Sequence, residues 1–161
     1  MGAPGSPPPW LVVGLGNALA GDDGIGARLA QHLREHPALP AGVEVLDGGT
    51  DLLRLAGALR GRRAVILVDA MVGAETGRLE VEPHGRAALS RVSTSAHGLS
   101  APGALDLLLL QEPALAATRF TWALVSVHDA VPGAALSAAL EAAVPALAAR
   151  LLALLDAETD G

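Results

Sequence analysis

The 161-residue sequence contains no cysteine and no tyrosine, and only one phenylalanine and two tryptophans. The absence of cysteine excludes disulfide bonds, thiol catalysis and cysteine-based zinc sites. Aromatic residues make up 2% of the chain and hydrophobic residues 51%, so we expect a core of alanine, leucine and valine. Positive charge is also scarce, because 11 basic residues stand against 17 acidic ones, for a net charge of −6. This balance has the wrong sign for an electrostatic nucleic-acid binder, and we expect no nucleic-acid partner.

Long, strongly apolar runs are missing as well. The most apolar stretch, residues 134–155, is rich in alanine and contains Glu141, Pro145 and Arg150, whereas a membrane span needs about 20 predominantly apolar residues. It is typical of a buried helix in a soluble protein, without a membrane partner. Residues 1–9 are rich in glycine and proline and have neither the basic nor the apolar region of a secretory signal. We therefore expect a cytoplasmic protein with a disordered tail over residues 1–9.

Apolar runs that alternate with amphipathic segments predict the fold. The pattern favours strands at 10–15, 43–47, 64–69, 77–82 and 120–127, and helices at 22–36, 50–59, 104–110 and 136–155. The β-branched run at 64–69 is typical of a central parallel strand, and 77–82 alternates like an edge strand. The order predicts an α/β fold, a three-layer αβα sandwich with a mostly parallel, twisted sheet of about five strands and helices on both faces. We expect a single domain over residues 10–155 and a C-terminal tail at 156–161.

The chain is organised around residues 12–26, where an apolar run ends in a glycine turn and two adjacent carboxylates follow. Gly14 and Gly16 permit a tight reversal and a close backbone approach, because neither has a Cβ atom. Asp22 can accept hydrogen bonds from the free N–H groups at the start of the next helix. One capping aspartate satisfies that role, so Asp23 needs another explanation.

Three candidate groups are expected at one edge of the sheet, because ligands of open α/β sheets bind beyond the carboxyl ends of the strands, near the topological switch point. Asp23 follows the first strand, Asp69 ends the third, and His97 lies in the loop after the edge strand. Two carboxylates and an imidazole suit a divalent transition metal, and open coordination positions suit catalysis. Singly, each residue has an ordinary explanation as a cap or a loop histidine. His128 and Asp129 follow the last strand and are candidates only for substrate contact or for supporting the metal-binding residues.

Three other motifs would indicate a different kind of site. The stretch from Gly14 to Leu19 begins like a dinucleotide fingerprint but has Leu19 where the third glycine belongs. The next strand ends in Asp47, so a dinucleotide-binding protein stays open as a weaker alternative. A P-loop is excluded because no Gly-Lys-Ser/Thr follows, and a serine-nucleophile elbow is absent.

Several motifs occur in order and at suitable spacing: Gly14-Leu15-Gly16-Asn17, Asp22-Asp23-Gly24-Ile25-Gly26, Leu46-Asp47-Gly48-Gly49-Thr50, Val68-Asp69-Ala70 and His97-Gly98-Leu99. Together they resemble the hydrogenase maturation endopeptidase family, the proteases that mature nickel–iron hydrogenases, over about residues 10–155. The resemblance implies an αβα sandwich that removes a short C-terminal extension from the hydrogenase large subunit after nickel insertion. It also implies that Asp23, Asp69 and His97 are the metal-contacting and catalytic residues. Many relatives carry glutamate at the position of Asp23, so the metal distance or preference can differ here.

The resemblance implies that Ni²⁺ is carried by the large-subunit precursor, which is the expected partner. We expect this protein to be a monomer that forms a transient one-to-one complex with the precursor. The ion would polarise the scissile carbonyl, activate a water, or serve as a docking check. Gly48, Gly49 and Thr50 lie at the same edge and are candidates for binding the extended tail, and Asp22 is the nearest candidate for a base or substrate contact.

Two further functions stay open. One is a non-catalytic metal- or precursor-binding chaperone on the same fold. The other is a protein like bacterial peptidyl-tRNA hydrolase, which shares the Gly-Leu-Gly-Asn start. That family continues with residues that this tyrosine-free chain lacks, and the negative charge disfavours tRNA.

Overall fold

Five strands form one sheet in the order β2-β1-β3-β5-β4. The computed structural model describes residues 5–85, 99–128 and 132–161. The strands are β1 (Trp10–Leu15), β2 (Val43–Gly49), β3 (Ala64–Val72), β4 (Leu79–Pro83) and β5 (Arg119–Val127). The first, second, third and fifth run parallel, and β4 pairs antiparallel with β5 at the edge. The predicted edge strand and the mostly parallel five-stranded sheet are therefore confirmed.

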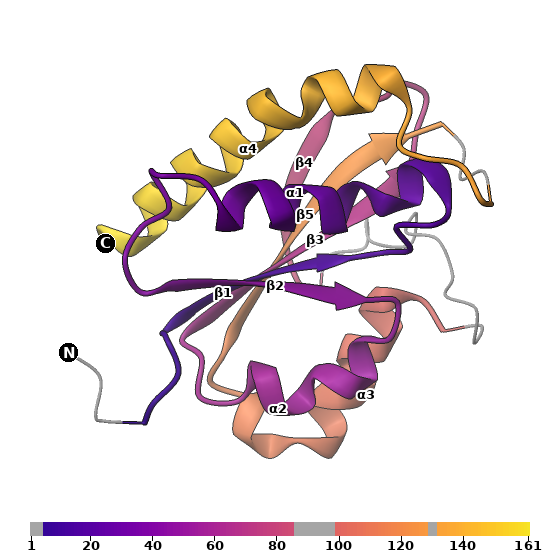
Figure 1. The fold of residues 1–161 in the computed structure, drawn as a ribbon. Helices are drawn as coiled ribbons and strands as arrows, with labels where there is room; N and C mark the ends of the chain where they lie inside the picture. Colours follow the sequence, from indigo (N-terminus) through magenta and orange to yellow (C-terminus); the bar gives the residue numbers. More distant parts are fainter. Residues whose placement is uncertain (1–4, 86–98, 129–131) are drawn as a thin grey trace.

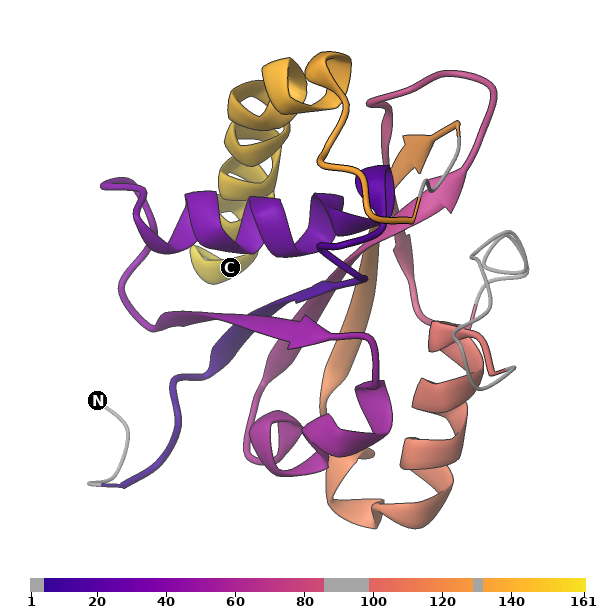
Figure 2. The ribbon, with the colours of Figure 1, turned by 45° about the vertical axis from the view of Figure 1, so that its right-hand side comes forward.

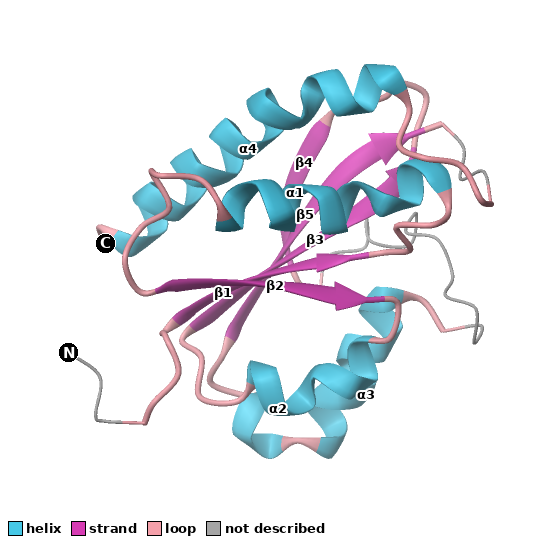
Figure 3. Cartoon of the chain, in the orientation of Figure 1, coloured by secondary structure: helices cyan, strands magenta, loops and turns pink. Residues whose placement is uncertain are grey.

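Helices cover both faces of this sheet (Figure 1). The helical elements are η1 (Gly21–Gly24), α1 (Ile25–Arg34), η2 (Leu52–Leu55), α2 (Ala56–Leu59), α3 (Ala101–Gln111), η4 (Pro113–Leu115) and α4 (Ala138–Thr159), where η marks a short 3₁₀ helix. Helices α1 and α4 lie on one face, and α2 and α3 lie on the other (Figures 1 and 3). This arrangement is the predicted three-layer αβα sandwich.

Alternate side chains of the strands fill two apolar cores. On β1, Val12 packs with α1 and α4, whereas Leu11 and Val13 pack with α2 and α3. All six residues of β1 are buried, as are the first eight of β3. A strand covered on both faces is apolar at nearly every position, which explains why these runs do not alternate. Asp69 is the exception on β3.

The ends of several elements differ from the prediction. Strand β3 continues to Val72, because it pairs with β5 as far as Val127, so Asp69 lies within the strand rather than at its end. The helix after β1 begins as a 3₁₀ turn, and its regular part starts at Ile25. The helical segment predicted from residue 50 begins at Leu52, because the side chain of Asp51 caps it by accepting the Leu53 N–H (3.1 Å).

The two ends of the chain also depart from the predicted tails. Helix α4 continues to Thr159, so residues 156–159 are helical, and Pro145 lies inside a continuous helix. Near the other end, the Pro8 carbonyl accepts a hydrogen bond from the buried Arg62 side chain (2.8 Å), and the Pro9 carbonyl accepts one from the Arg63 N–H (2.8 Å). The segment before β1 is therefore attached to the fold at these carbonyls.

Helix α4 is long and apolar enough to cross a membrane by length and composition alone. In this structure it lies on the sheet beside α1 (Figure 2). Its buried side chains belong to the core that it shares with α1 and the sheet: Leu140, Val144, Leu147, Ala148, Leu151, Leu152 and Leu155. Core helices of soluble proteins share this hydropathy, and the packing explains it here.

Candidate functional site

The order of the strands places a topological switch point between β1 and β3. The chain leaves β1 through α1 to β2 on one side, then returns through α2 to β3 on the other side of β1. Such a reversal opens a crevice beyond the carboxyl ends of the two strands. Asp23 lies in η1, directly after β1, and Asp69 lies on β3, one residue past the Gly14–Val68 pair. The structure therefore brings these two predicted residues to the switch point.

Asp69 is a buried acid, with 7% of its surface exposed. The pKa of its carboxyl group is raised to about 7, mainly by burial and further by the charge of Asp23, against the opposing effect of a hydrogen bond from the Ala70 N–H (2.8 Å). The effect of Asp23 shows that the two carboxyl groups interact electrostatically. Across the described ranges Asp69 forms no ion pair with a basic side chain. A buried carboxylate without a cation is costly, so the pair fits a bound positive charge.

Asp23 is held by the turn that follows β1. Its Oδ2 accepts the Asn17 N–H (2.7 Å), and its own N–H donates to the Ala20 carbonyl (3.3 Å). Gly16 has φ +117°, and a Cβ atom there would lie 2.1 Å from the Asp23 carbonyl oxygen. Only glycine therefore lets this turn close around the carboxylate.

The predictions for Asp22 need correction. Its side chain forms no cap on η1, whose N-cap residue, Ala20, makes no side-chain hydrogen bond. Instead, Oδ1 accepts the Ser137 N–H (2.7 Å) and Oδ2 accepts the Ser137 hydroxyl (3.0 Å). With both oxygens engaged inside the fold, this carboxylate is poorly placed to act as a base or to bind substrate.

The two glycines that end β2 are also largely engaged by contacts inside the fold. A Cβ atom on Gly48 would lie 2.5 Å from Val13 Cγ1, so this residue faces the core. Gly49 donates its N–H to Asp47 Oδ1 (3.1 Å), and its carbonyl accepts the Gly16 N–H (2.9 Å). Of the three predicted tail-binding residues, Thr50 is the most exposed, and nothing lies within 4 Å of a Cβ atom placed on Gly49.

His97 lies outside the described residues, and so does Asp129. His128 is exposed at the end of β5, the neighbour of β3 in the sheet. Within residues 5–85, 99–128 and 132–161, no three histidine or acidic side chains form a group that could hold a metal ion. The described part of the site is thus the Asp23–Asp69 pair.

Two residues that support this site were not predicted from the sequence. Asn17 orients Asp23 through its backbone N–H, which no side-chain pattern reveals. Ser137 caps α4 through the Leu140 N–H (3.3 Å), and a serine before an apolar run does signal a helix start. Its contact with Asp22 spans 115 positions and has no local signal.

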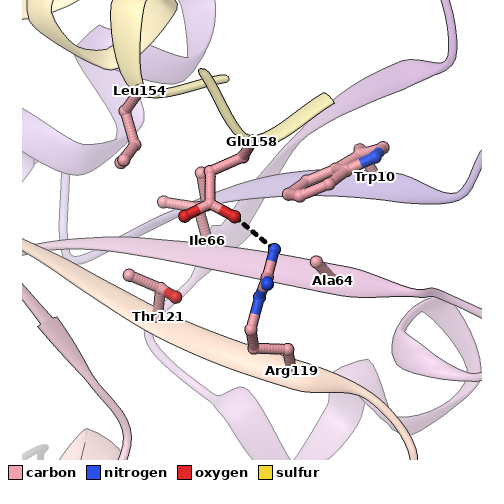
Figure 4. Close-up of a pocket in the computed structure, with 7 residues that line it drawn as sticks. All are labelled: Trp10, Ala64, Ile66, Arg119, Thr121, Leu154 and Glu158. Carbon is pink, nitrogen blue, oxygen red and sulfur yellow. Dashed lines mark hydrogen bonds and ion pairs between the residues drawn. The ribbon is translucent and has the colours of Figure 1, made fainter. Parts of the chain in front are cut away.

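A small pocket lies at the opposite end of the strands (Figure 4). It is lined by Trp10, Ala64, Ile66, Arg119, Thr121, Leu154 and Glu158. Its volume of about 10 Å³ is room for no more than one water. Arg119 forms an ion pair with Glu158 and lies 5.5 Å from the centre of the Trp10 ring. The pocket holds no substrate-sized space, and the carboxylate pair remains the better candidate.

Comparisons with known proteins point to one family. Residues 27–154 match the family HycI, described as hydrogenase maturation protease. Among solved structures, the hydrogenase maturating endopeptidase HybD from Escherichia coli is similar with a TM-score of 0.77, at 29% identity, over 92% of this chain and 93% of that chain. The [NiFe] hydrogenase maturation protease HybD from Thermococcus kodakarensis is similar with a TM-score of 0.72, at 26% identity, over 90% and 97%.

Sequence similarity to curated relatives is more local. The chain is 44% identical over 62 residues to hydrogenase 2 maturation protease of Escherichia coli K12, and this stretch covers 38% of each chain. It is 46% identical over 61 residues to the hydrogenase expression/formation protein HupD of Rhodobacter capsulatus, covering 38% of this chain and 29% of that protein. The chain thus spans about a third of the length of the curated relatives that it matches.

Proposed function

Since this chain belongs to the hydrogenase maturation protease family, we propose that it is an endopeptidase that removes the C-terminal extension of a nickel-loaded [NiFe]-hydrogenase large-subunit precursor. The proposed reaction takes place in the cytoplasm, in a transient complex between one copy of this chain and one precursor. Nickel enters as part of the substrate, carried by the precursor. Asp23 and Asp69 engage it, together with His97.

The observation that supports this function best is the pairing of Asp23 with the buried Asp69 at the switch point. A carboxylate kept only for structure is normally matched by donors or a cation inside the fold. Asp69 accepts one backbone hydrogen bond, from its own neighbour. A divalent cation delivered by the precursor would compensate the two carboxylates, and two oxygens with one imidazole nitrogen suit nickel.

Each acid then has a distinct task. Asp23 is oriented before the substrate arrives, because Asn17 holds one of its oxygens. With a pKa of about 7, Asp69 carries a proton in part of the free molecules at neutral pH and releases it when a cation binds. The nickel ion supplies a Lewis acid that polarises the scissile carbonyl or activates a water. Asp22 is not assigned as the base, since each of its oxygens already accepts a hydrogen bond from Ser137.

The test incubates nickel-loaded precursor with the purified protein and follows the precursor by mass spectrometry. We expect a mass loss equal to the C-terminal extension. Asp23→Ala, Asp69→Ala and His97→Ala should each abolish the loss, whereas Asp156→Ala, at an exposed position on α4, should leave it unchanged. An unchanged precursor mass with a retained complex would favour a chaperone on the same fold.

A further inference from the structure

Asp22 and Ser137 join two parts of the chain that lie 115 positions apart. Asp22 is 9% exposed, and each of its carboxylate oxygens accepts a hydrogen bond from Ser137, one from the N–H (2.7 Å) and one from the hydroxyl (3.0 Å). The Ser137 oxygen also accepts the Leu140 N–H and so caps α4 without help from the acid. The buried charge of Asp22 therefore serves something other than this cap.

Backbone hydrogen bonds join the same two segments. The Gly21 N–H donates to the Ala134 carbonyl (3.0 Å), and the Gly133 N–H donates to the Leu19 carbonyl (2.7 Å). With the two bonds of Asp22, they hold the turn at 17–24 against the segment at 132–137. These segments lie side by side in Figures 1 and 2.

The turn held in this way is the one that presents Asp23. The carboxylate of Asp23 accepts the Asn17 N–H at the start of the turn, and its own N–H bonds to Ala20 in the middle. Neither of these contacts reaches beyond the turn itself. The direction of the Asp23 carboxylate thus depends on how the whole turn is anchored.

We propose that Asp22 is a positioning residue, which anchors the turn at 17–24 on Ser137 at the start of α4 and thereby aims Asp23 at Asp69. The catalytic effect of this anchor rests on the proposed function, whereas the anchoring of the turn itself does not. Hydrogen bonds to an ionised acceptor are stronger than neutral ones, so this anchor is firmer than the two backbone bonds beside it. Through Ser137, helix α4 then helps to hold the turn that carries Asp23.

The geometric part is tested by amide hydrogen exchange, measured by NMR on the free protein. In Asp22→Ala, protection of the Asn17 N–H should fall, because the anchor of the turn is lost. Asp22→Asn should restore most of it, since its amide oxygen can accept the Ser137 N–H and its NH₂ group can donate to the hydroxyl. If Asp22→Ala proves unstable, Ser137→Ala removes one bond of the anchor and should give an intermediate loss of protection.

The catalytic part is tested by cleavage of nickel-loaded precursor. Partners that orient a metal-contacting side chain typically contribute about 10- to 100-fold to metal affinity or activity. We expect kcat/KM of Asp22→Ala to fall by that factor and that of Asp22→Asn to stay within about threefold of wild type. Glu141→Ala is the matched control, because Glu141 joins α4 to Arg28 of α1 (2.8 Å) without touching the turn. It should change thermal stability but neither Asn17 exchange nor kcat/KM.

Unchanged Asn17 protection in Asp22→Ala, or unchanged cleavage by it, would overturn the proposal. If the wild-type protein leaves the precursor intact, the proposed function fails instead, and the exchange comparison then decides on the geometry alone. Equal losses of activity in Asp22→Ala and Glu141→Ala at equal thermal stability would also overturn it, because they would point to general destabilisation.

Discussion

At the residue scale, burial of the Asp69 carboxylate lowers the stability of the folded protein. Its pKa is about 7 in the folded protein against an ordinary 3.8, so the folded state binds the proton more tightly than the unfolded state does. The stability associated with this proton is present below about pH 4 and is lost as the pH rises through 7. At about 1.4 kcal/mol per pKa unit, the loss is at most about 4 kcal/mol.

Asp69→Asn is therefore expected to be more stable than wild type at pH 8, by up to about 4 kcal/mol, while it loses processing activity. The neutral amide avoids the burial of a charge, and its oxygen can still accept the Ala70 N–H. Urea unfolding at pH 5 and pH 8 measures the difference between the two proteins, which should grow with pH. Asp156→Asn, at an exposed position, should show no such growth. A constant difference for Asp69→Asn would contradict the assigned pKa.

At the element scale, the approach of α1 to the sheet sets the distance between the two acids. Gly26, in the first turn of α1, touches backbone on two strands. A Cβ atom there would lie 2.2 Å from the Leu15 oxygen on β1 and 2.6 Å from the Val68 oxygen on β3. Asp23 lies in η1, two residues before α1 begins at Ile25, and Asp69 follows Val68. The glycine thus permits a contact that brings the start of the helix to the strand that carries the other acid.

Gly26→Ala should destabilise the protein by about 1–3 kcal/mol or more, because backbone atoms cannot move aside as side chains do. Processing should fall further than stability alone explains, since α1 must shift away from β3. Gly57→Ala on α2 is the control, as nothing lies within 4 Å of its Cβ position. It should stabilise the protein by up to about 1 kcal/mol. Denaturant unfolding and precursor cleavage measure both variants, and equal behaviour of the pair would refute this role of Gly26.

Elements of this fold are predictable where their cause is local. Strand β1 has the predicted bounds, Trp10–Leu15, because a fully buried strand is uniformly apolar. The sequence does not predict the end of β3, because Val72 belongs to the strand through its pairing with Val127, which lies far along the chain. The role of Asp22 was missed for the same reason, since a capping aspartate and one that binds Ser137 look identical in sequence.

At the scale of the whole molecule, the candidate site follows from topology. Alternating strands and helices predicted that acids after β1 and on β3 would meet at one edge, and the order β2-β1-β3-β5-β4 places Asp23 and Asp69 there. Their proposed engagement of nickel, with His97, stays a prediction.

The same edge carries exposed apolar side chains. Of the large hydrophobic residues in the described ranges, Leu19 is 76% exposed in the turn after β1, and Val72 is 58% exposed at the end of β3. Leu53, 37% exposed, follows β2. These side chains follow the carboxyl ends of three neighbouring strands, where a precursor would approach under the proposed function.

Leu19→Glu and Val72→Glu are therefore expected to weaken precursor binding about tenfold, a loss of about 1.4 kcal/mol. The loss should appear as a higher KM with kcat and thermal stability little changed, because neither side chain is buried. Leu110→Glu is the matched control: it is 82% exposed near the end of α3, which leads to the start of β5 at the opposite edge, and it should process precursor like wild type. Equal KM values for Leu19→Glu, Val72→Glu and Leu110→Glu would show that the precursor docks elsewhere, and a fall in kcat alone would show that these residues act on the carboxylate pair rather than on docking.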